Sequence, residues 1–520
     1  MAGPMKLAAA AGVLAAALAP ALVSPQPTAR SHSAAATVLF VDRESRGGAC
    51  SDARTAAEAA SAATPWCSLV RAVHAAPPDT TVAVRGGDYP ELAVANDRRR
   101  TQPLIFRRHE IEPVTIAGLE VTNSSLLTFV GFVFTGNVDV TRSSAQVTLS
   151  KNEVRGVHVW LSRTSNVVIE GNRIHGLRGG SAIGIRLLGD AGTVIRGNVI
   201  EDLISDPIQV GEVRDVVIER NVLRKAHPDN GQHTDAIQVL GARGLTIRSN
   251  QVTDVAHGFM FTDAEARDVV IENNVVAHIS NGLGLKAEGS FGMPGLRIVN
   301  NTWHDTRLGV DLRRSHPNAV VRNNIFDTVD GLEEQPAADH NLIARTPPGR
   351  RYGPNSIVAR PRFVDSASLE LARGSPGIDA GSAVGAPATD RQGRPRRDDP
   401  GRANTGVGGV RYTDIGAHER QPGRVTVPPR VQIDVVRRRG VPIQVEPPFG
   451  EPNVRIVLRS GARGTRATTR TRTMVVRGAR AAIRIVLTSP VAGRYVVAAR
   501  FGARAASVGA PVTATFMVVR

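Results

Sequence analysis

The stretch VVIEGNRI at residues 167–174 decides the fold, because seven other stretches of the chain repeat its pattern. Each repeat has an apolar third position, an Asn at its sixth position and an apolar eighth position. Alternation of Val and Ile is typical of a short strand with one buried face, and an Asn after a strand suits a turn, because its amide tolerates left-handed backbone. Stacked on one another, these amides would form a hydrogen-bonded ladder. The aligned asparagines are Asn152, Asn172, Asn198, Asn221, Asn250, Asn274, Asn301 and Asn324.

The repeat length predicts a parallel β-solenoid, because the asparagines follow one another at intervals of 20–29 residues. In such a fold each coil buries its apolar face only against its neighbours. A leucine-rich repeat would need Leu-rich helical segments, and the sequence has none. The pattern therefore resembles a right-handed parallel β-helix over roughly residues 80–345. The predicted fold class is all-β, with an N-terminal capping helix and a small C-terminal β-sandwich.

The remaining sequence divides the chain further. The start has one Lys followed by an Ala-rich apolar run, which is typical of a secretory signal and predicts a secreted, extracellular or cell-wall-associated protein. A retained N-terminal anchor is the alternative. The predicted segments are a signal peptide and spacer (1–36), the β-helix with its cap (37–345), its closing segment (346–420), a linker (421–424) and an Arg-rich β-sandwich module (425–520).

The segment before the first coil contains both cysteines of the chain, Cys50 and Cys67. In an oxidising compartment an even pair indicates one disulfide, with free thiols as the alternative. The amphipathic stretch SLVRAVHAA at residues 68–76 predicts a short helix that covers the open end of the solenoid.

The C-terminal module carries almost all of the net charge. Residues 421–520 contain 18 Arg and three acidic residues, which places +15 of the chain's +17 there. Seven short alternating segments, from VQIDVV to PVTATFMVV, predict the strands of the sandwich. The module could bind anionic wall or matrix polymers, or its charge could be a compositional bias on a soluble surface. We expect no nucleic acid, because export and the lack of interleaved aromatics argue against it. We also expect a monomer.

A second strand follows each Asn, and these strands predict a groove. Aligned as RGVHVW, SAIGIR, DPIQVG, DAIQVL, HGFMFT, NGLGLK and LGVDLR, they have apolar third and fifth positions, which point inward. In this alignment Lys286 shares the sixth column with Arg313, one coil away, and lies two coils, about 10 Å, from Asp235. An adjacent guanidinium disfavours the ammonium form of an amine, so Lys286 could act as a general base. An insertion before Asp235, RKAHPDNGQHT, adds His227, Asp229 and His233.

The two stacked acids Asp206 and Asp235 could serve two kinds of chemistry. At about 5 Å they cannot both ionise unless a cation lies between them or one is protonated. They could hold Ca²⁺, which takes oxygen ligands, with Gln209 or Gln238 contributing. They could also be the acid/base pair of a glycoside hydrolase.

Three consecutive coils carry a resemblance to a known family. The order GQHTDAIQV, VAHGFMFTD and SNGLGLKAEG is similar to the pectate lyases of polysaccharide lyase family 9. The resemblance implies that Lys286 is the base and that Asp235 is one calcium ligand. This chain departs from the family where Ala256, His257 and Gly258 replace a paired Asp-Asp-Gly and Met260 replaces a further Asp. His257, Asp206 or Arg313 would then have to supply the missing charge.

These observations predict cleavage of an acidic, uronic-acid-containing polysaccharide by β-elimination. The alternatives are a non-catalytic glycan-binding surface protein and a hydrolase that uses the two acids. The expected catalytic residues are Lys286, Arg313, Asp235 and His257, and the expected substrate-binding residues are Gln209, Gln238, His233, Arg186, Asn281 and Trp160.

Overall fold

A computed structural model describes residues 37–179, 182–229, 233–262, 265–287, 292–314, 316–346, 349–350, 352–460, 469–476, 480–487, 493–503, 509 and 511–519. The predicted signal peptide and spacer, residues 1–36, lie outside the described residues. Among the described helices, none combines the length and the apolar character that a membrane crossing requires.

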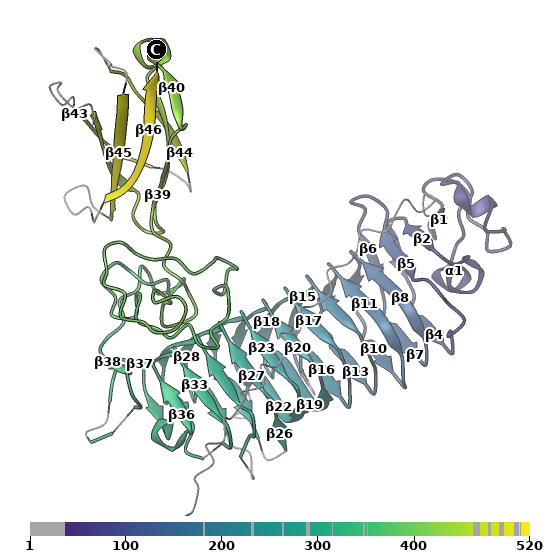
Figure 1. Cartoon of the computed structure of the whole chain (residues 1–520). Coiled ribbons are helices and arrows are strands. Elements are labelled where there is room, and N and C mark those ends of the chain that lie inside the picture. Colours follow the sequence, from purple (N-terminus) through teal and green to yellow (C-terminus); the bar gives the residue numbers. More distant parts are fainter. Residues whose placement is uncertain are drawn as a thin grey trace, which may run out of the picture. The chain divides into compact units, whose positions relative to one another are not determined.

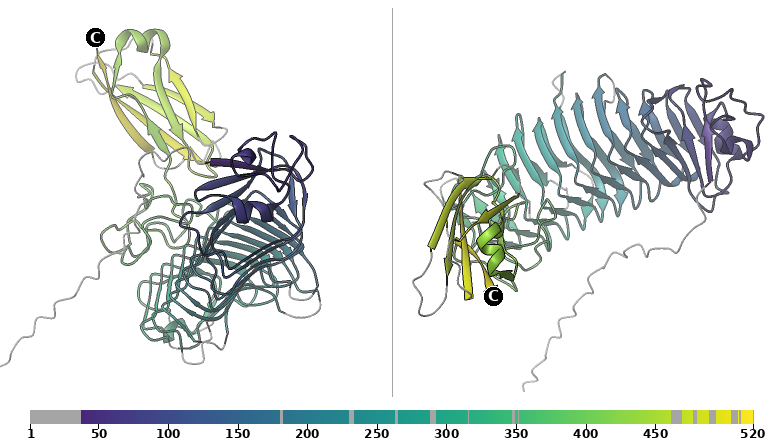
Figure 2. Two further views of the ribbon diagram at one scale, coloured as in Figure 1. Left: turned by 90° about the vertical axis from the view of Figure 1, so that its right-hand side faces the viewer. Right: turned by 90° about the horizontal axis from the view of Figure 1, so that it is seen from above.

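Stacked coils of short parallel strands extend from residue 37 to residue 358, and their strands line up in three long sheets (Figure 1). Figure 2 shows the same row of coils from two further sides, with the N-terminal strands (purple) at one end of the row. Every pairing within the three sheets that joins consecutive coils is parallel, as a solenoid requires. The solenoid prediction is therefore confirmed.

The first sheet, here called the repeat sheet, contains the strands of the sequence repeat. Its strands among the described residues are β1 (Thr37–Val41), β2 (Thr80–Val84), β5 (Leu104–Arg108), β8 (Ser125–Val130), β11 (Ala145–Ser150), β14 (Val168–Glu170), β17 (Val194–Arg196), β20 (Val217–Glu219), β23 (Thr246–Arg248), β27 (Val270–Glu272), β30 (Arg297–Val299), β33 (Val320–Arg322) and β36 (Ala337–Asp339).

The second sheet, here called the groove sheet, contains the strands predicted to line the groove. Its described strands are β4 (Leu92–Ala95), β7 (Leu119–Thr122), β10 (Val138–Thr141), β13 (Val159–Ser162), β16 (Ile185–Leu188), β19 (Ile208–Arg214), β22 (Asp235–Arg243), β25 (His257–Phe261), β29 (Leu285–Ala287), β32 (Val310–Asp311) and β35 (Val329–Asp330), with β26 (Ala266–Arg267) paired to β22.

The third sheet follows the ladder asparagines. Its described strands are β3 (Gly87–Tyr89), β6 (Val114–Ile116), β9 (Val133–Phe134), β12 (Glu153–Arg155), β15 (Arg173–Leu177), β18 (Val199–Leu203), β21 (Val222–Ala226), β24 (Gln251–Val255), β28 (Val275–Ile279), β31 (Thr302–Thr306), β34 (Ile325–Phe326), β37 (Leu342–Ile343) and β38 (Ile357–Val358). One continuous apolar cluster, from Leu39 to Tyr352, lies inside the coils.

The predicted asparagine ladder is present at the corner between the repeat sheet and the third sheet. Asn250 Oδ1 accepts hydrogen bonds from the backbone N–H of Asn221 (2.9 Å) and from its Nδ2 (3.1 Å). Asn250 Nδ2 donates to Ile218 O (2.9 Å) and to Asn274 Oδ1 (3.0 Å). The same pattern runs through the aligned residues and continues one coil further to Asn341. All of these asparagines are buried away from water, so the ladder supplies the hydrogen-bond partners that their backbone and amide groups need.

The expected reason for the asparagines was wrong in one respect. The left-handed residue of the turn precedes the ladder Asn and is not the Asn itself, as at Gly171, Arg220 and Ser249. The ladder Asn is selected for its amide, which bonds in both directions along the stack. In the last repeats the preceding residue is also Asn, and its free amide bonds the closing segment: Asn273 Nδ2 donates to Thr389 O, and Asn323 Nδ2 donates to Ser382 O.

The N-terminal segment contains the disulfide Cys50–Cys67, as predicted. Helix α1 (Leu69–Ala75) begins after Ser68, whose hydroxyl accepts a hydrogen bond from Arg71 N–H. Leu69, Ala72 and Val73 are buried in the same cluster as the first coils. The role of helix α1 as a cap of the solenoid stays a prediction.

The C-terminal region is rich in antiparallel strands that share one apolar cluster. The described strands form one sheet of β39 (Arg424–Thr426), β41 (Val441–Glu446) and β44 (Ala481–Ile485), and another of β40 (Arg430–Gln432), β46 (Pro511–Val519), β45 (Gly493–Gly502), β42 (Asn453–Ser460) and β43 (Thr469–Val475).

The strand predicted at VQIDVV is wrong beyond its first two residues, because helix α2 (Ile433–Arg439) begins there. Asp434 lies in the first turn and Arg437–Arg439 lie in the last turn, so the charges match the helix dipole. Only Val436 of this helix is buried, so the segment lacks the alternation of buried and exposed residues that would favour a strand. The predicted segment boundaries at residues 346, 421 and 425 stay predictions.

We predict that Asn250→Ala destabilises the β-helix more than an exposed Asn→Ala change. The variant leaves the N–H and Nδ2 of Asn221 without their buried acceptor, and each unsatisfied group costs about 1–3 kcal/mol. Urea denaturation followed by circular dichroism measures the effect. Asn137→Ala, at an exposed position, is the control and should change stability by less than about 0.5 kcal/mol. Equal effects of the two variants would contradict the role of the ladder.

Removing the disulfide should weaken the N-terminal segment specifically. The bond closes a loop with a sequence separation of 17, for which chain entropy predicts about 3 kcal/mol. We expect the Cys50→Ser/Cys67→Ser variant to be cut by trypsin within residues 37–90 at denaturant concentrations that leave the later coils intact. Unchanged proteolysis there would show that the segment is stabilised by packing alone.

Candidate functional site

The groove sheet carries a row of outward side chains in hydrogen-bonded register. The pairings join Trp160 to Arg186, Arg186 to Gln209, Gln209 to Gln238, Gln238 to Met260, Met260 to Lys286 and Lys286 to Asp311. Neighbouring strands lie about 4.8 Å apart, so the row brings Gln209, Gln238, Met260 and Lys286 onto four consecutive strands.

This register corrects the predicted alignment. Lys286 pairs with Asp311 and not with Arg313, and the predicted column of Lys286 and Arg313 is wrong. Strand β16 is likewise displaced by two residues, because Ile185 rather than Ile183 pairs with Ile208. A displacement of two residues leaves the inward and outward alternation unchanged, so the apolar pattern cannot reveal it.

The acid pair lies at the beginning of two adjacent groove strands. Asp206 precedes β19, Asp235 begins β22, and Asp206 Oδ1 accepts a hydrogen bond from Asp235 N–H at 2.8 Å. Burial raises the pKa of Asp206 to about 6. Burial, together with the charge of Asp206, raises the pKa of Asp235 to about 7, although His233 and Lys286 oppose the rise. The pair is therefore partly protonated near neutral pH, which is one of the two solutions expected from the sequence.

Two histidines adjoin this acid pair. His233 Nδ1 lies 3.2 Å from Asp235 Oδ2, and His257 pairs with Asp235 across the sheet. The two imidazole rings meet edge to face, with centroids 6.3 Å apart. Burial, followed by the charges of His233 and Lys286, lowers the pKa of His257, so its ring is neutral at pH 7.

The backbone at Gly282 makes room for the ring of His257. A Cβ at residue 282 would lie 1.9 Å from His257 Nδ1, so any side chain there would displace the imidazole. Gln209 and Gln238 complete this part of the sheet. Gln209 Nε2 donates to Gln238 Oε1 and lies 3.4 Å from Asp206 Oδ2.

The structure does not bring all of the predicted residues together. Arg313 follows β32 and forms an ion pair with Asp311 at 2.6 Å. Burial alone would raise the pKa of Asp311, but hydrogen bonds from Arg313 lower it below its usual value. Asn281 lies before β29, where its Oδ1 accepts from Arg307 Nη1 at 3.2 Å. Trp160, which is 37% exposed, lies two strands beyond Gln209.

Sequence reasoning missed two parts of the groove sheet. The sequence alignment of the groove strands places Asp311 at a different position from Lys286, its partner in the sheet. The arginines Arg214 and Arg243 lie beyond the six-residue segments that were aligned, because β19 and β22 extend to seven and nine residues. The signal was available as the repeated Val-Arg and Ala-Arg ends of GEVRD and GARGL.

Two carboxylates, those of Asp206 and Asp235, are the donors predicted to hold Ca²⁺. Ca²⁺ takes six to eight oxygen ligands. Among the described residues no cluster of three or more His, Cys, Asp or Glu side chains is arranged to hold a metal ion. Asp206 Oδ1 is already committed to the backbone of Asp235. Calcium at this pair stays a prediction.

Comparison with known proteins identifies the region that carries this site. Residues 101–233 and 235–346 match the family described as "Right handed beta helix region". This region is a right-handed β-helix. The handedness and the resemblance predicted from the asparagine repeat are thereby confirmed, and the groove sheet is one face of this β-helix.

Several solved structures are similar to the chain over much of their length. A rhamnogalacturonan lyase has 11% identity and a TM-score of 0.43, and the match covers 59% of this chain and 87% of that one. The pectate lyase Pel9A has 13% identity and a TM-score of 0.39, over 74% and 96%. The A-module of the Azotobacter vinelandii mannuronan C-5 epimerase AlgE6 has 15% identity and a TM-score of 0.30, over 59% and 98%. At these values the likenesses support no statement about the reaction. Among curated proteins no significant match is found.

The acid pair predicts a distinctive pH dependence of stability. The pKa of Asp235 is about 7 in the folded protein, above about 3.9 in the unfolded chain, so the folded state retains a proton that the unfolded state releases. The stabilisation is full below about pH 4 and is lost as the pH rises through 7. Melting temperatures should therefore fall less between pH 5 and 8 for Asp235→Asn than for the wild type. Asp229→Asn, an exposed control in the preceding loop, should follow the wild type. Parallel curves for all three proteins would contradict the raised pKa.

Proposed function

We propose that this β-helix cleaves an acidic, uronic-acid-containing polysaccharide by β-elimination on the groove sheet. The observation that carries the proposal is that a cation, Lys286, lies on the coil next to His257, close enough for its charge to act on that neutral imidazole. The row that includes Arg186, Gln209 and Gln238 continues from them along the same face. A long polar face of this kind suits an extended chain of sugars.

The proposed reaction has three requirements. A positive charge must neutralise the carboxylate of the uronate so that its C5 proton becomes acidic. A neutral base must then remove that proton, and an acid must protonate the departing O4 as the C4–O4 bond breaks and a C4–C5 double bond forms. General acid–base groups of this kind contribute about 10²–10⁴-fold in rate.

The surroundings of Lys286 support a role different from the one the resemblance implies. The positive charge of Lys286 lowers the pKa of His257 and opposes the rise in the pKa of Asp235. Its partner in the sheet is Asp311 rather than a guanidinium. We therefore assign Lys286 to the substrate carboxylate and His257 to the abstraction of the C5 proton.

The proton for the leaving oxygen has a source in the same cluster. His233 is the most exposed member, with 61% of its side chain accessible, and its Nδ1 faces Asp235. Asp235, whose pKa is about 7, retains a proton near neutral pH. We assign His233 as the acid that contacts O4 and Asp235 as the residue that positions it.

Burial argues against the hydrolase alternative. Asp235 is 0% exposed and Asp206 is 4% exposed, so neither carboxylate reaches an anomeric carbon in the groove. The cleavage assay at 235 nm distinguishes the lyase from a non-catalytic glycan-binding protein. Export of the protein and attachment through the Arg-rich C-terminal module remain parts of the proposal that activity does not test.

Cleavage is measured as absorbance at 235 nm, which reports the unsaturated product, with the purified protein and a panel of uronic-acid polymers. Lys286→Met should lower the rate by about 10²-fold or more, whereas Lys225→Met, at an exposed position in the third sheet, should leave it unchanged. Lys286→Arg keeps the positive charge and should retain a measurable part of the rate if Lys286 binds the carboxylate. Complete loss in Lys286→Arg, with a rate that still rises above pH 8 in the wild type, would identify Lys286 as the base.

His257→Gln should abolish the reaction under the proposed assignment while leaving the melting temperature close to that of the wild type. The pH profile of kcat/KM should rise through a pKa below 6.5, because the pKa of His257 is lowered, and should fall again on the alkaline side, because the departing O4 needs a proton from an acid. No unsaturated product from any polymer would reject lyase activity and favour the glycan-binding alternative. Reducing ends without absorbance at 235 nm would favour the hydrolase.

A further inference from the structure

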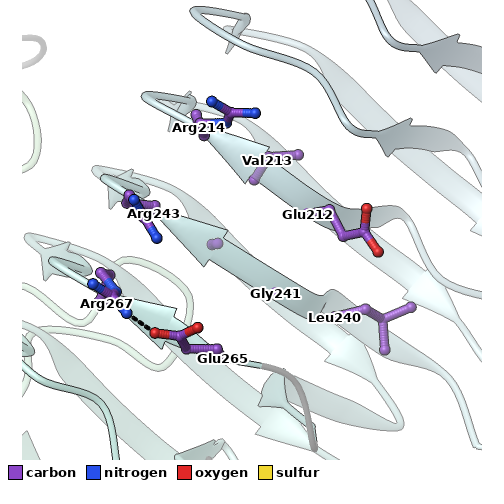
Figure 3. Close-up of a pocket in the computed structure, with 9 residues that line it drawn as sticks. Glu212, Val213, Arg214, Leu240, Gly241, Arg243, Glu265 and Arg267 are labelled. Carbon is purple, nitrogen blue, oxygen red and sulfur yellow. Dashed lines mark ion pairs between the residues drawn. The ribbon is translucent and has the colours of Figure 1, made fainter.

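A second charged feature lies on the groove sheet, at the opposite ends of the strands that carry the candidate site. Arg214 at the end of β19 pairs with Arg243 at the end of β22, and Arg243 pairs with Arg267 of β26. The three arginines therefore stand in register on three consecutive coils, whose strands lie about 4.8 Å apart. Figure 3 shows them as a row along one side of a pocket. We call Arg214, Arg243 and Arg267 the arginine row.

The backbone directs these side chains outward. Glu212 has a φ of 54° and Gly241 has a φ of 113°, so both strands bend before their last residues. After the bends Val213 and Ala242 are buried, and the arginines that follow them point to solvent. The bends also hollow the surface into a pocket of about 550 Å³. Arg243 lies five residues from Gln238 along β22, about 16 Å away, so the arginine row is separate from the row of Lys286.

Internal ion pairs do not account for the row. Arg267 forms an ion pair with Glu265, which lies on the same coil. Among the described residues, Arg214 and Arg243 have no side-chain hydrogen bond or ion pair to any carboxylate. Like charges in register repel one another, which is a cost in the empty protein that a bound anion would remove.

We infer that the arginine row binds the carboxylates of an acidic polysaccharide chain that runs along the β-helix, from coil to coil. Three cations at regular spacing match a polymer that carries one charge on each sugar. The rest of the pocket favours a sugar over a bare polyphosphate. Glu212 and the exposed side chain of Leu240 lie on the side of the pocket away from the arginines (Figure 3). A carboxylate accepts hydrogen bonds from sugar hydroxyls, and an apolar side chain covers the face of a sugar ring. This inference does not depend on cleavage by the candidate site.

The test measures binding of a fluorescently labelled oligogalacturonate by anisotropy, with the full chain in a His257→Gln background so that no substrate is consumed. The triple variant Arg214→Gln/Arg243→Gln/Arg267→Gln should bind about tenfold more weakly at low ionic strength, because several exposed ion pairs are removed together. Its affinity should also depend less on salt than that of the parent. A methyl-esterified oligomer, which lacks the charges, should not distinguish the two proteins.

Two matched variants make the result decisive. Arg107→Gln/Arg108→Gln/Arg220→Gln removes the same charge from exposed positions of the β-helix outside the groove sheet, and its affinity should stay within about twofold of the parent. Arg214→Lys/Arg243→Lys/Arg267→Lys keeps the charge and should retain most of the affinity, which separates loss of charge from loss of structure. If both triple Arg→Gln variants bound the oligomer equally weakly, the loss would reflect net charge alone, and the inference would be overturned. Unchanged binding by the groove triple would overturn it directly, whether or not the protein proves to be a lyase.

Discussion

The hydrogen bond between the side chain of one ladder asparagine and the backbone of the next is the interaction on which the rest of this structure depends. Each turn between the repeat sheet and the third sheet buries polar backbone groups where water does not reach. The stacked amides satisfy these groups, and because one amide both donates and accepts along the stack, every coil must sit directly over its neighbour. This fixes the vertical register at one corner of the coil. The apolar interior then fills with Val, Ile, Leu and Phe side chains in continuous contact.

The rigid corner leaves the rest of each coil free to vary in length, and the candidate site uses that freedom. The insertion before β22 brings His233 beside Asp235, and Gly282, just before β29, leaves room for the ring of His257. The site combines two buried acids with groups that lie nearer to solvent. Burial keeps a proton on the acid pair near pH 7, and the same burial keeps His257 neutral. Burial thus favours the uncharged form of both the carboxylic acids and the imidazole. Lys286 contributes positive charge at the edge of the cluster.

Particular residues show how much of the fold and of the candidate site the sequence predicted. The asparagine spacing predicted the solenoid, and the coil-by-coil order of the groove strands placed Asp206, Asp235, His257 and Lys286 on one face. The same alignment placed Lys286 beside Arg313, whereas the sheet places it beside Asp311. It also cut each strand to six residues and so passed over Arg214 and Arg243 at the ends of longer strands. Both errors come from treating the coils as identical where the structure inserts bends and offsets.

The sequence by itself determined the fold, because a buried amide that recurs every 20–29 residues and a period of two in apolar residues permit only stacked coils with one face inward. It also determined which coils carry ionisable side chains on the groove sheet. Only the tertiary structure decided which of those side chains are neighbours. A strand can slip by two residues without moving any apolar side chain out of the core, so the pattern that specifies the fold does not specify the pairs across the groove. The burial that sets the pKa values of Asp235 and His257 is likewise a property of the assembled coils and of no single stretch.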